Sequence, residues 1–322
     1  MLAEHPSFEL AFATSDRLVS APVGRHVGAR CALSFEPNEA ALSLSERVDG
    51  VVLATPAQVS LALVPELIRR GKRVIDLSGA FRLKDAACYP RWYGFEHTAP
   101  ALLSIAHYGV PELFGNPQGA LVANPGCYPT AALLALSPLI RAGLIDVSQP
   151  IIVDGKSGVS GAGRQSKEEY SFCEIAEDVR AYKVLAHQHT PEIAQALAAS
   201  AGAKVHVVFT PHLVPVRRGL VTTCYARPAG DLARSLDVER ALRAAYEPHR
   251  FVEVVAAGEA TMASVVGTNR ARVGVAVEDE MIVAVCAIDN LLKGAAGQAL
   301  QNLHALFGLD DGALDRLQRS AP

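Results

Sequence analysis

Cys127 stands where the sequence changes from an apolar strand to a helix, within the segment Ala123–Ala132. The apolar run Ala120–Ala123 predicts the strand, and Pro129 suits the first helical position, with leucines at helical spacing after it. Free N–H groups at the helix start and the helix dipole would favour a thiolate there. Because a thiolate is a strong nucleophile, the turn indicates covalent catalysis, although free cysteines are often small buried hydrophobic residues.

The elements that must position this turn begin with alternating strands and helices. Runs at Phe8–Ala13, Val51–Ala54 and Arg73–Leu77 predict strands, and Ala57–Arg69 fits a helix. Continuous apolar strands separated by helices are typical of a parallel sheet covered on both faces. Ligands of such sheets bind at the carboxyl ends of the strands. One crevice is therefore expected along Thr14-Ser15, Thr55-Pro56, Ser78-Gly79 and Asn124-Pro125.

Beyond Ile145 the pattern becomes α+β with a mostly antiparallel sheet. Helices are expected at 191–201 and 238–246, and a last helix at Leu291–Phe307 carries an apolar stripe. Residues 278–280 read as a hairpin turn between the last two strands. The five expected strands are Ile151–Val153, Val205–Phe209, Leu220–Tyr225, Val273–Val277 and Met281–Val285.

The composition argues against a nucleic-acid-binding, membrane-bound or disulfide-rich protein. The 322 residues fit one large or two ordinary domains, and a net charge of -3 gives no reason to expect nucleic acid or a membrane surface as partner. The six cysteines lack paired spacing, which predicts reduced thiols in a cytoplasmic protein and neither disulfides nor a metal site. No apolar run approaches the roughly 20 residues of a membrane span, and the first residues do not form a secretory signal.

The segment Asn124–Ala131 resembles the active-site segment of the N-acetyl-gamma-glutamyl-phosphate reductases of arginine biosynthesis. The resemblance runs from about His5 to about Leu306. It implies a Rossmann-like dinucleotide-binding domain at 1–127 and 290–322, and an inserted catalytic domain at 128–289. It also implies NADP(H) as cofactor and a homodimer or homotetramer. The other matching segments, in the family's order, are Ile75–Leu83, Tyr108–Leu113, Ser157–Arg164, His187–Ile193 and Asp289–Gly294.

The implied reaction is NADPH-dependent reduction of N-acetyl-gamma-glutamyl phosphate to N-acetylglutamate 5-semialdehyde and phosphate. Cys127 would attack the acyl carbon and expel phosphate, giving a thioester electrophilic enough to accept hydride. By resemblance His187 is the acid–base residue, which would protonate the oxyanion or assist collapse of the thiohemiacetal. Gln188 stands where the family usually has arginine, so no charge role is assigned to that position.

Substrate contacts are implied for two segments. Tyr182, His189 and Glu192 match family positions, although Glu192 and Thr190 are equally suited to capping a helix with Pro191 at its first position. The loop Ser157–Arg164 is rich in glycine and hydroxyls and would present N–H donors to an anion, with Arg164 as a planar fork. The substrate candidates are Asn124, Ser157, Gly158, Arg164, Tyr182, His189 and Glu192.

The cofactor side shows a difference from the family. A dinucleotide domain normally begins with a strand, a glycine-rich turn and a helix. The sequence before Phe8 resembles the end of the family's first helix, so two unpaired strand edges are expected. Either the natural protein begins about twenty residues upstream, or the short chain binds cofactor poorly. The cofactor candidates are Ser15, Arg17, Thr55, Pro56 and Ser78 from the crevice, and Asn290 from the resemblance.

Three alternatives remain open from the sequence. An aspartate-semialdehyde or acetylaminoadipyl-phosphate type of acyl-phosphate reductase would share the cysteine and the domain plan. A cofactor-free binding protein is compatible with the missing glycine turn, although Cys127 and His187 are both retained. A cysteine–histidine hydrolase would use the same pair without a redox step.

Overall fold

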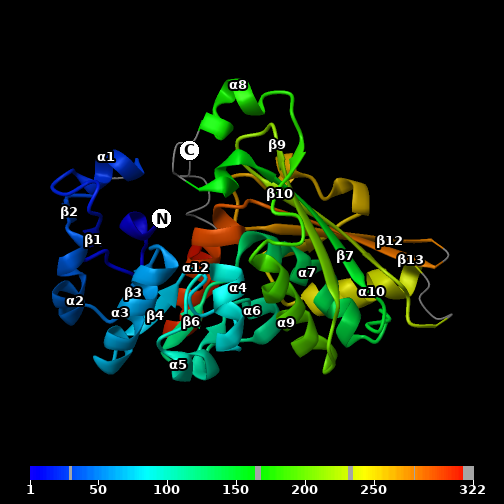
Figure 1. The fold of residues 1–322 in the computed structure, drawn as a ribbon, viewed down its shortest axis with the longest axis horizontal. Coiled ribbons are helices and arrows are strands. Elements are labelled where there is room, and N and C mark those ends of the chain that lie inside the picture. Colours follow the sequence, from blue (N-terminus) through cyan, green and yellow to red (C-terminus); the bar gives the residue numbers. More distant parts are fainter. Residues whose placement is uncertain (29–30, 164–167, 231–234, 279, 315–322) are drawn as a thin grey trace.

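The computed structural model describes residues 1–28, 31–163, 168–230, 235–278 and 280–314 (Figure 1). A parallel sheet in the first part of the chain has the strand order β3-β4-β6-β5. Helix α3 covers one face of it, where Leu61 and Val64 pack near Val51. Helix α12 belongs to the cluster that holds Ile75 and Val122, on the other face. The elements are β3 (Gly50–Leu53), α3 (Ala57–Arg69), β4 (Arg73–Asp76), β5 (His107–Tyr108), β6 (Leu121–Ala123) and α12 (Gly297–Phe307).

This arrangement confirms the Rossmann-like part and the return of the last helix onto the first sheet. Strands β4 and β6 read as continuous apolar runs because both of their faces are buried. Shorter helices connect the strands. They are α1 (Val23–Val27), α2 (Ala41–Leu44), α4 (Tyr89–Tyr93), α5 (Pro100–Ile105) and α6 (Pro111–Phe114).

A separate two-stranded parallel sheet lies at the outer side of this part, formed by β1 (Ala13–Thr14) and β2 (Phe35–Glu36). The expected strand Phe8–Ala13 is wrong in extent, because Phe8 instead packs its ring against His304 and Phe307 of α12, 5.6 and 5.7 Å away between centroids. Among the described residues, no strand pairs with a second edge of β1 or with the outer edge of β3. The unpaired strand edges expected from the sequence are therefore present.

A seven-stranded sheet forms the second part. Four of its neighbouring pairs are antiparallel, while β7–β9 and β11–β12 are parallel, so the mostly antiparallel prediction is correct. The described strands run longer than the apolar runs indicated. In spatial order they are β11 (Val252–Val254), β12 (Ala271–Glu278), β13 (Met281–Ile288), β10 (Leu220–Ala226), β7 (Ile151–Gly158), β9 (Val207–Val214) and β8 (Arg180–Ala181). The predicted turn at 278–280 includes residue 279, which lies outside the described residues.

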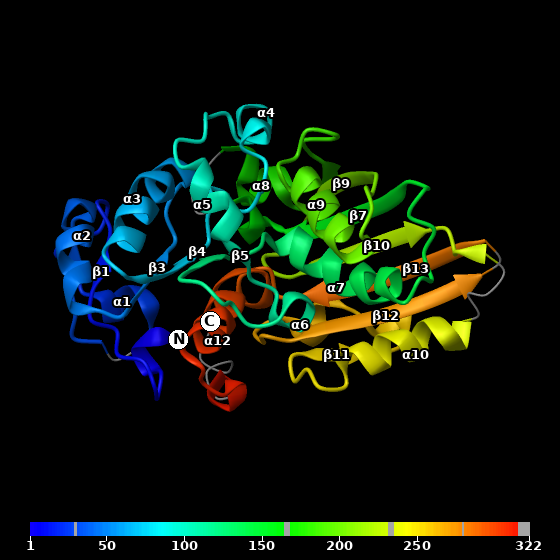
Figure 2. The same ribbon diagram turned by 90° about the horizontal axis from the view of Figure 1, so that it is seen from below.

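Three helices cover one face of this sheet, α7 (Cys127–Arg141), α9 (His189–Ala201) and α10 (Ser235–Tyr246) (Figure 2). Helix α7 is the most buried of the three, and every residue from Tyr128 to Ile140 is buried from solvent. Pro138 has no N–H for the carbonyl of Leu134, and the Tyr246 hydroxyl donates to that oxygen instead, at 2.5 Å. This part also contains two short α-helices, α8 (Phe172–Ile175) and α11 (Met262–Val265).

The start of the last helix departs from the predicted regular helix Leu291–Phe307. Residues Leu292–Ala296 form a π-helical turn, in which the N–H groups of Gly294 and Ala296 bond to carbonyls five residues earlier, each at 2.9 Å. Single π-turns within helices are frequent at functional sites. No helix in the described parts of the chain is long and apolar enough to cross a membrane. The domain boundaries at residues 127 and 290 stay a prediction.

Candidate active site

Cys127 is the first residue of α7, with Gly126 as an extended N-cap. The helix thus begins two residues before Pro129, the position expected from the sequence. Hydrogen bonds hold the preceding turn at both ends. The Asn124 N–H donates to Asp76 O at 2.8 Å, and the Gly126 N–H donates to Glu192 Oε1 at 2.9 Å. The cysteine is therefore placed at a free helix N-terminus at the carboxyl end of β6.

The Cys127 thiol is less acidic than the sequence predicted. Burial raises its pKa to about 11, and the opposing effects of the Tyr128 N–H and the Arg82 charge are smaller. The expectation of a resting thiolate is therefore wrong, because the cost of burying a charge exceeds the stabilisation from the helix start. At neutral pH the thiol keeps its proton, and attack on a substrate requires a proton acceptor.

Two buried histidines, His187 and His189, lie beside the cysteine turn, with ring centroids 4.6 Å apart. Burial first, and then the neighbouring His189, lower the pKa of His187 to about 2. Burial and the Arg82 charge also lower the pKa of His189 well below its ordinary value. Both rings are therefore neutral at pH 7. His189 Nε2 lies directly against Gly126, where a Cβ on that glycine would collide with it.

Glu192 connects the histidine helix to the cysteine turn. Its Oε1 accepts from Tyr108 Oη at 2.7 Å and from the Gly126 N–H, and its Oε2 lies 3.5 Å from Arg82 Nη1 and 3.9 Å from His189 Nε2. Helix α9 begins at His189 with Gln188 as N-cap, so the expected cap near Thr190, with Pro191 first in the helix, is wrong by two residues. Glu192 therefore holds the turn that carries Cys127.

Arg82 was not predicted as a site residue, yet it completes this buried network. Its Nε donates to Asn124 O at 2.8 Å and its Nη2 donates to Leu77 O at 2.7 Å. The ion pair with Glu192 is almost fully buried on both sides. The only sequence signal for Arg82 is its place in the matching segment Ile75–Leu83, since nothing local shows that an arginine there is buried.

Tyr182 lies on the other side of His187, with ring centroids 5.6 Å apart. Its hydroxyl is 3.5 Å from that of Tyr128, which in turn donates to His212 O at 3.1 Å. The segment between Tyr182 and His187 holds Lys183 and Leu185 at positive φ, 45° and 55°. A non-glycine residue with positive φ has a strained backbone, which the surrounding structure must hold in place. Such strained residues are frequent at functional sites.

The loop that follows β7 differs from the expected anion-binding loop. The N–H groups of Gly158, Val159 and Ser160 donate to carbonyls of Gly219, Val216 and Arg217, at 2.9 to 3.1 Å. These donors therefore face the β9–β10 connection and not a ligand.

The side chains of this region also have internal partners. The Ser157 hydroxyl donates to Gly158 O at 3.0 Å. Asn290 Nδ2 donates to Ser160 Oγ at 3.0 Å, and Asn290 Oδ1 accepts from the Gly219 N–H at 2.8 Å. Ligand roles for Ser157, Gly158 and Asn290 stay predictions, and Arg164 lies outside the described residues.

Comparison with known proteins decides the family. A reductase from Magnetococcus marinus is 43% identical, over 98% of this chain and 93% of its own length. One from Rhodopirellula baltica is 41% identical, over 97% and 92%. Both are named N-acetyl-gamma-glutamyl-phosphate reductase. The chain belongs to this family. Models of the semialdehyde dehydrogenase NAD binding domain and dimerisation domain match residues 1–118 and 127–290.

Solved structures support the fold. An aspartate semialdehyde dehydrogenase II from Vibrio cholerae, complexed with ASA, has a TM-score of 0.71 at 18% identity, over 95% of this chain and 92% of that one. The enzyme from Candida albicans with NADP has a TM-score of 0.64 at 16% identity, over 95% and 93%. Membership confirms the predicted class, an oxidoreductase of the semialdehyde dehydrogenase type with a nicotinamide dinucleotide-binding domain.

The carboxyl edge of the parallel sheet fits part of such a cofactor. Thr55 follows β3, with its hydroxyl 2.8 Å from Ser60 Oγ, and Pro56 is the N-cap of α3. Ser78 follows β4 and donates to Asp76 Oδ2 at 2.8 Å. These groups share one edge with Cys127, as a dinucleotide reaching the nucleophile would require. Ser15 and Arg17 follow β1 in the separate sheet, and residues 1–12 hold no glycine-rich turn for the pyrophosphate.

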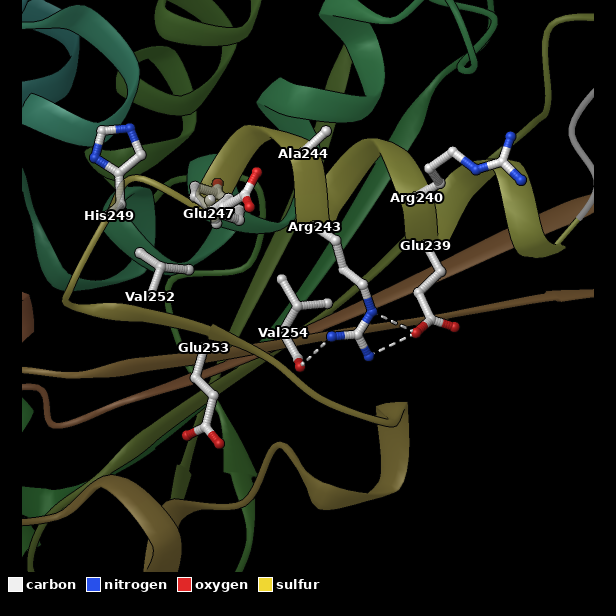
Figure 3. Close-up of a pocket in the computed structure, with 10 residues that line it drawn as sticks. Glu239, Arg240, Arg243, Ala244, Glu247, His249, Val252, Glu253 and Val254 are labelled. Atoms are coloured by element: carbon white, nitrogen blue, oxygen red, sulfur yellow. Dashed lines mark hydrogen bonds and ion pairs between the residues drawn. The ribbon is translucent and has the colours of Figure 1, made fainter.

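A hollow of about 730 Å³ lies elsewhere, against α10 and residues 247–254 (Figure 3). Arg243 in its wall is already bound to Glu239 Oε1 at 2.8 Å and to Val254 O at 3.4 Å. None of the candidate catalytic, substrate or cofactor residues lines it. The candidate site at the start of α7 is therefore separate from this hollow.

Proposed function

We propose that this protein reduces N-acetyl-gamma-glutamyl phosphate with NADPH to N-acetylglutamate 5-semialdehyde and phosphate, a step of arginine biosynthesis. The observation that carries the proposal is the pairing of Cys127, at a helix N-terminus, with two buried neutral histidines. Identity of 41–48% to reductases of that name supports the choice of substrate over aspartate-semialdehyde or acetylaminoadipyl-phosphate chemistry.

The first step is attack by Cys127 on the acyl carbon. A bond forms between Sγ and this carbon, the bond from the carbon to the phosphate oxygen breaks, and phosphate leaves with the bonding pair. The product is a thioester on Cys127. Bound NADPH would supply the hydride that reduces this carbon. The resulting thiohemiacetal then releases the aldehyde, and the sulfur recovers a proton.

The surroundings of the two histidines suit them to different proton transfers. His187 Nδ1 accepts the His189 N–H at 3.1 Å, so the proton of the neutral ring is assigned to Nε2. That ring is then a donor, suited to the oxyanion, as expected for His187. The thiol proton needs another acceptor, and His189 is the candidate because its Nε2 lies against Gly126, the residue before Cys127. We assign His189 to the thiol and His187 to the oxyanion.

The remaining chain holds these groups in place. Glu192 and Arg82 fix the turn before Cys127, and Tyr182 stands beside His187 as a substrate-side residue. Asn124, at the carboxyl end of β6, lies on the same turn as the nucleophile. For NADP(H) we propose contacts from Ser15, Arg17, Thr55, Pro56, Ser78 and Asn290.

An assay in the reverse direction tests the function. Purified protein is mixed with N-acetylglutamate 5-semialdehyde, phosphate and NADP⁺, and NADPH formation is followed, beside a form extended upstream by any encoded glycine-rich turn. Activity of either form supports the proposal, whereas activity only with aspartate semialdehyde would replace the substrate. Acyl phosphate hydrolysis without NADPH would favour the hydrolase. Inactivity of both folded forms with every substrate would favour a binding protein.

We further propose a homo-oligomer in the cytoplasm, built on the open face of the seven-stranded sheet. The strand register places Val208, Ile152, Tyr225 and Val283 in one row across β9, β7, β10 and β13, each at least partly exposed. The family description names this part a dimerisation domain. The six cysteines lack the paired spacing of a disulfide framework, which favours a reducing compartment. Light scattering should show a smaller species for Ile152→Glu, and an unchanged mass would contradict this interface.

A further inference from the structure

A buried charged cluster lies close to Cys127 but outside the catalytic groups described so far. Lys293 Nζ donates to Glu112 Oε1 at 2.6 Å and to Gln301 Oε1 at 2.7 Å. Gln301 Nε2 closes the ring by donating to the same Glu112 oxygen at 2.9 Å. The Lys293 and Glu112 side chains are 0% and 1% exposed. We refer to Glu112, Lys293 and Gln301 as the Lys293 cluster.

The Lys293 cluster joins three elements, because Glu112 belongs to α6, Lys293 to the π-turn and Gln301 to α12. Glu112 Oε2 is buried and has no hydrogen-bond partner among the described residues. Burial alone would raise the pKa of Glu112, but the Lys293 charge and the bonds from Lys293 and Gln301 hold it below its ordinary value. The Glu112 carboxyl is therefore ionised, and its charge depends on Lys293 beside it.

The residue after Lys293 touches the nucleophile. A Cβ on Gly294 would lie 2.7 Å from Cys127 Cβ, so the π-turn backbone packs directly against the cysteine. The Ala295 carbonyl of the same turn accepts from Asn124 Nδ2 at 3.2 Å, and Asn124 Oδ1 accepts from Asn302 Nδ2 at 2.9 Å. The π-turn is thus fastened to the cysteine turn on one side and to α6 on the other.

Stability does not account for this arrangement. Replacing a buried ion pair by apolar side chains of similar volume is often neutral or stabilising, because the desolvation of two charges offsets their attraction. A buried ion pair fixes the register of the segments that carry it better than apolar contacts do, because only one alignment of these segments pairs both charges. A register error of one residue in the π-turn would move Gly294 away from Cys127.

We infer that the Lys293 cluster positions the nucleophile, by fixing the register of the π-turn so that Gly294 supports Cys127 from behind. None of the three residues contacts the reacting atoms, so they are positioning residues. The inference rests on the proposed function only in taking Cys127 as the nucleophile. Alkylation of Cys127 by iodoacetamide, followed by mass spectrometry of its peptide, reads the thiol without substrate or cofactor.

The first experiment compares Lys293→Met, Glu112→Gln and the double variant with the unaltered protein. Each single variant leaves a buried charge without its partner and should lower the melting temperature. The double variant removes both charges and should recover stability. If the cluster positions Cys127, the alkylation rate and its pH profile stay altered in the double variant, and kcat stays about 10²-fold low with little change in KM. Recovery of alkylation and kcat together with stability would overturn the inference.

A second experiment uses two glycines of the same segment as matched variants. Gly294→Ala places a methyl group against Cys127, whereas Gly297→Ala places one against Asn269 Oδ1 and the carbonyl carbon of Leu292, and not against Cys127. Both should destabilise the fold by crowding. Only Gly294→Ala should change the rate and pH profile of Cys127 alkylation. Equal changes in both variants, or none in either, would show that the π-turn does not set the position of the thiol. If reductase activity is absent from every form, this readout still stands.

Discussion

Cys127 and Cys286 are two thiols packed against the same core, and both have a pKa above that of an ordinary thiol. Burial raises the pKa of Cys127 to about 11, and it raises the pKa of Cys286 as well. Cys286 lies in β13 among apolar side chains, fully buried. Cys127 is partly accessible, at a helix N-terminus, beside two neutral imidazoles. The difference indicates that access and a proton acceptor, and not resting thiolate content, distinguish a nucleophilic cysteine here.

The strongest way to break this comparison is to replace each thiol in turn. Cys127→Ser should lower reductase turnover by about 10⁴-fold or more, because no thioester can form. Cys286→Ala is the matched control and should keep turnover close to that of the unaltered protein. Steady-state kinetics on folded variants, checked by circular dichroism, measure both. Substantial turnover of Cys127→Ser would rule out the thioester route.

Removal of the proton acceptors should have the next largest effect. His187→Asn and His189→Asn should each lower kcat by about 10²- to 10⁴-fold, the usual contribution of a general acid or base. They should differ in alkylation, since only His189→Asn removes the acceptor assigned to the thiol. An unchanged pH–rate profile in His187→Asn would show that this ring does not transfer the proton.

The pH dependence of thiol reactivity sharpens the comparison further. A raised pKa means that the thiolate fraction of Cys127 is small at pH 7 and grows as pH rises toward about 11. Iodoacetamide labelling of the resting protein should therefore increase about tenfold per pH unit between pH 7 and 10. Cys286 should stay unlabelled until the protein unfolds. A plateau for Cys127 below pH 8 would mean that the resting site already holds a thiolate.

The smallest expected effect concerns stability alone. Cys286→Ser introduces a hydroxyl into an apolar part of the core, at a cost of about 1–3 kcal/mol in the free energy of unfolding. Chemical denaturation would measure it, and kcat should remain unchanged. A large loss of kcat at full stability would connect β13 to catalysis in a way that the geometry does not support.

Much of this site was predictable because its signals are local. The strand, the turn and the helix around Cys127 follow from apolar runs and a Pro-Gly pair. The fold class follows from the alternation of apolar strand segments with helical segments in the first part of the chain. The thiol pKa was not predictable, because it depends on burial by segments distant in sequence. Arg82, Tyr108 and Glu112 were not predicted as buried residues near the site for the same reason. The sequence alone does not show that a charged or polar side chain will be buried.

The π-turn is a further limit of sequence reasoning. Leu291–Phe307 has the apolar spacing of a regular helix, and no residue in it marks the wider turn at Leu292–Ala296. The turn follows from tertiary contacts, namely the close approach of Gly294 to Cys127 and the bonds of Lys293 to Glu112. Periodicity therefore identified the helix but could not locate the irregularity within it.

The small sheet of β1 and β2 has a consequence for how the molecule opens. It consists of two strands of two residues each, with no other strand partner among the described residues, and such a pair is marginal by itself. The long strands β7, β10 and β13 are paired along their whole lengths. Amide hydrogens in β1 and β2 should therefore exchange with solvent through local opening, far faster than those of the central strands. A protease should therefore cut at β1 and β2 first, while the half that carries Cys127 stays folded.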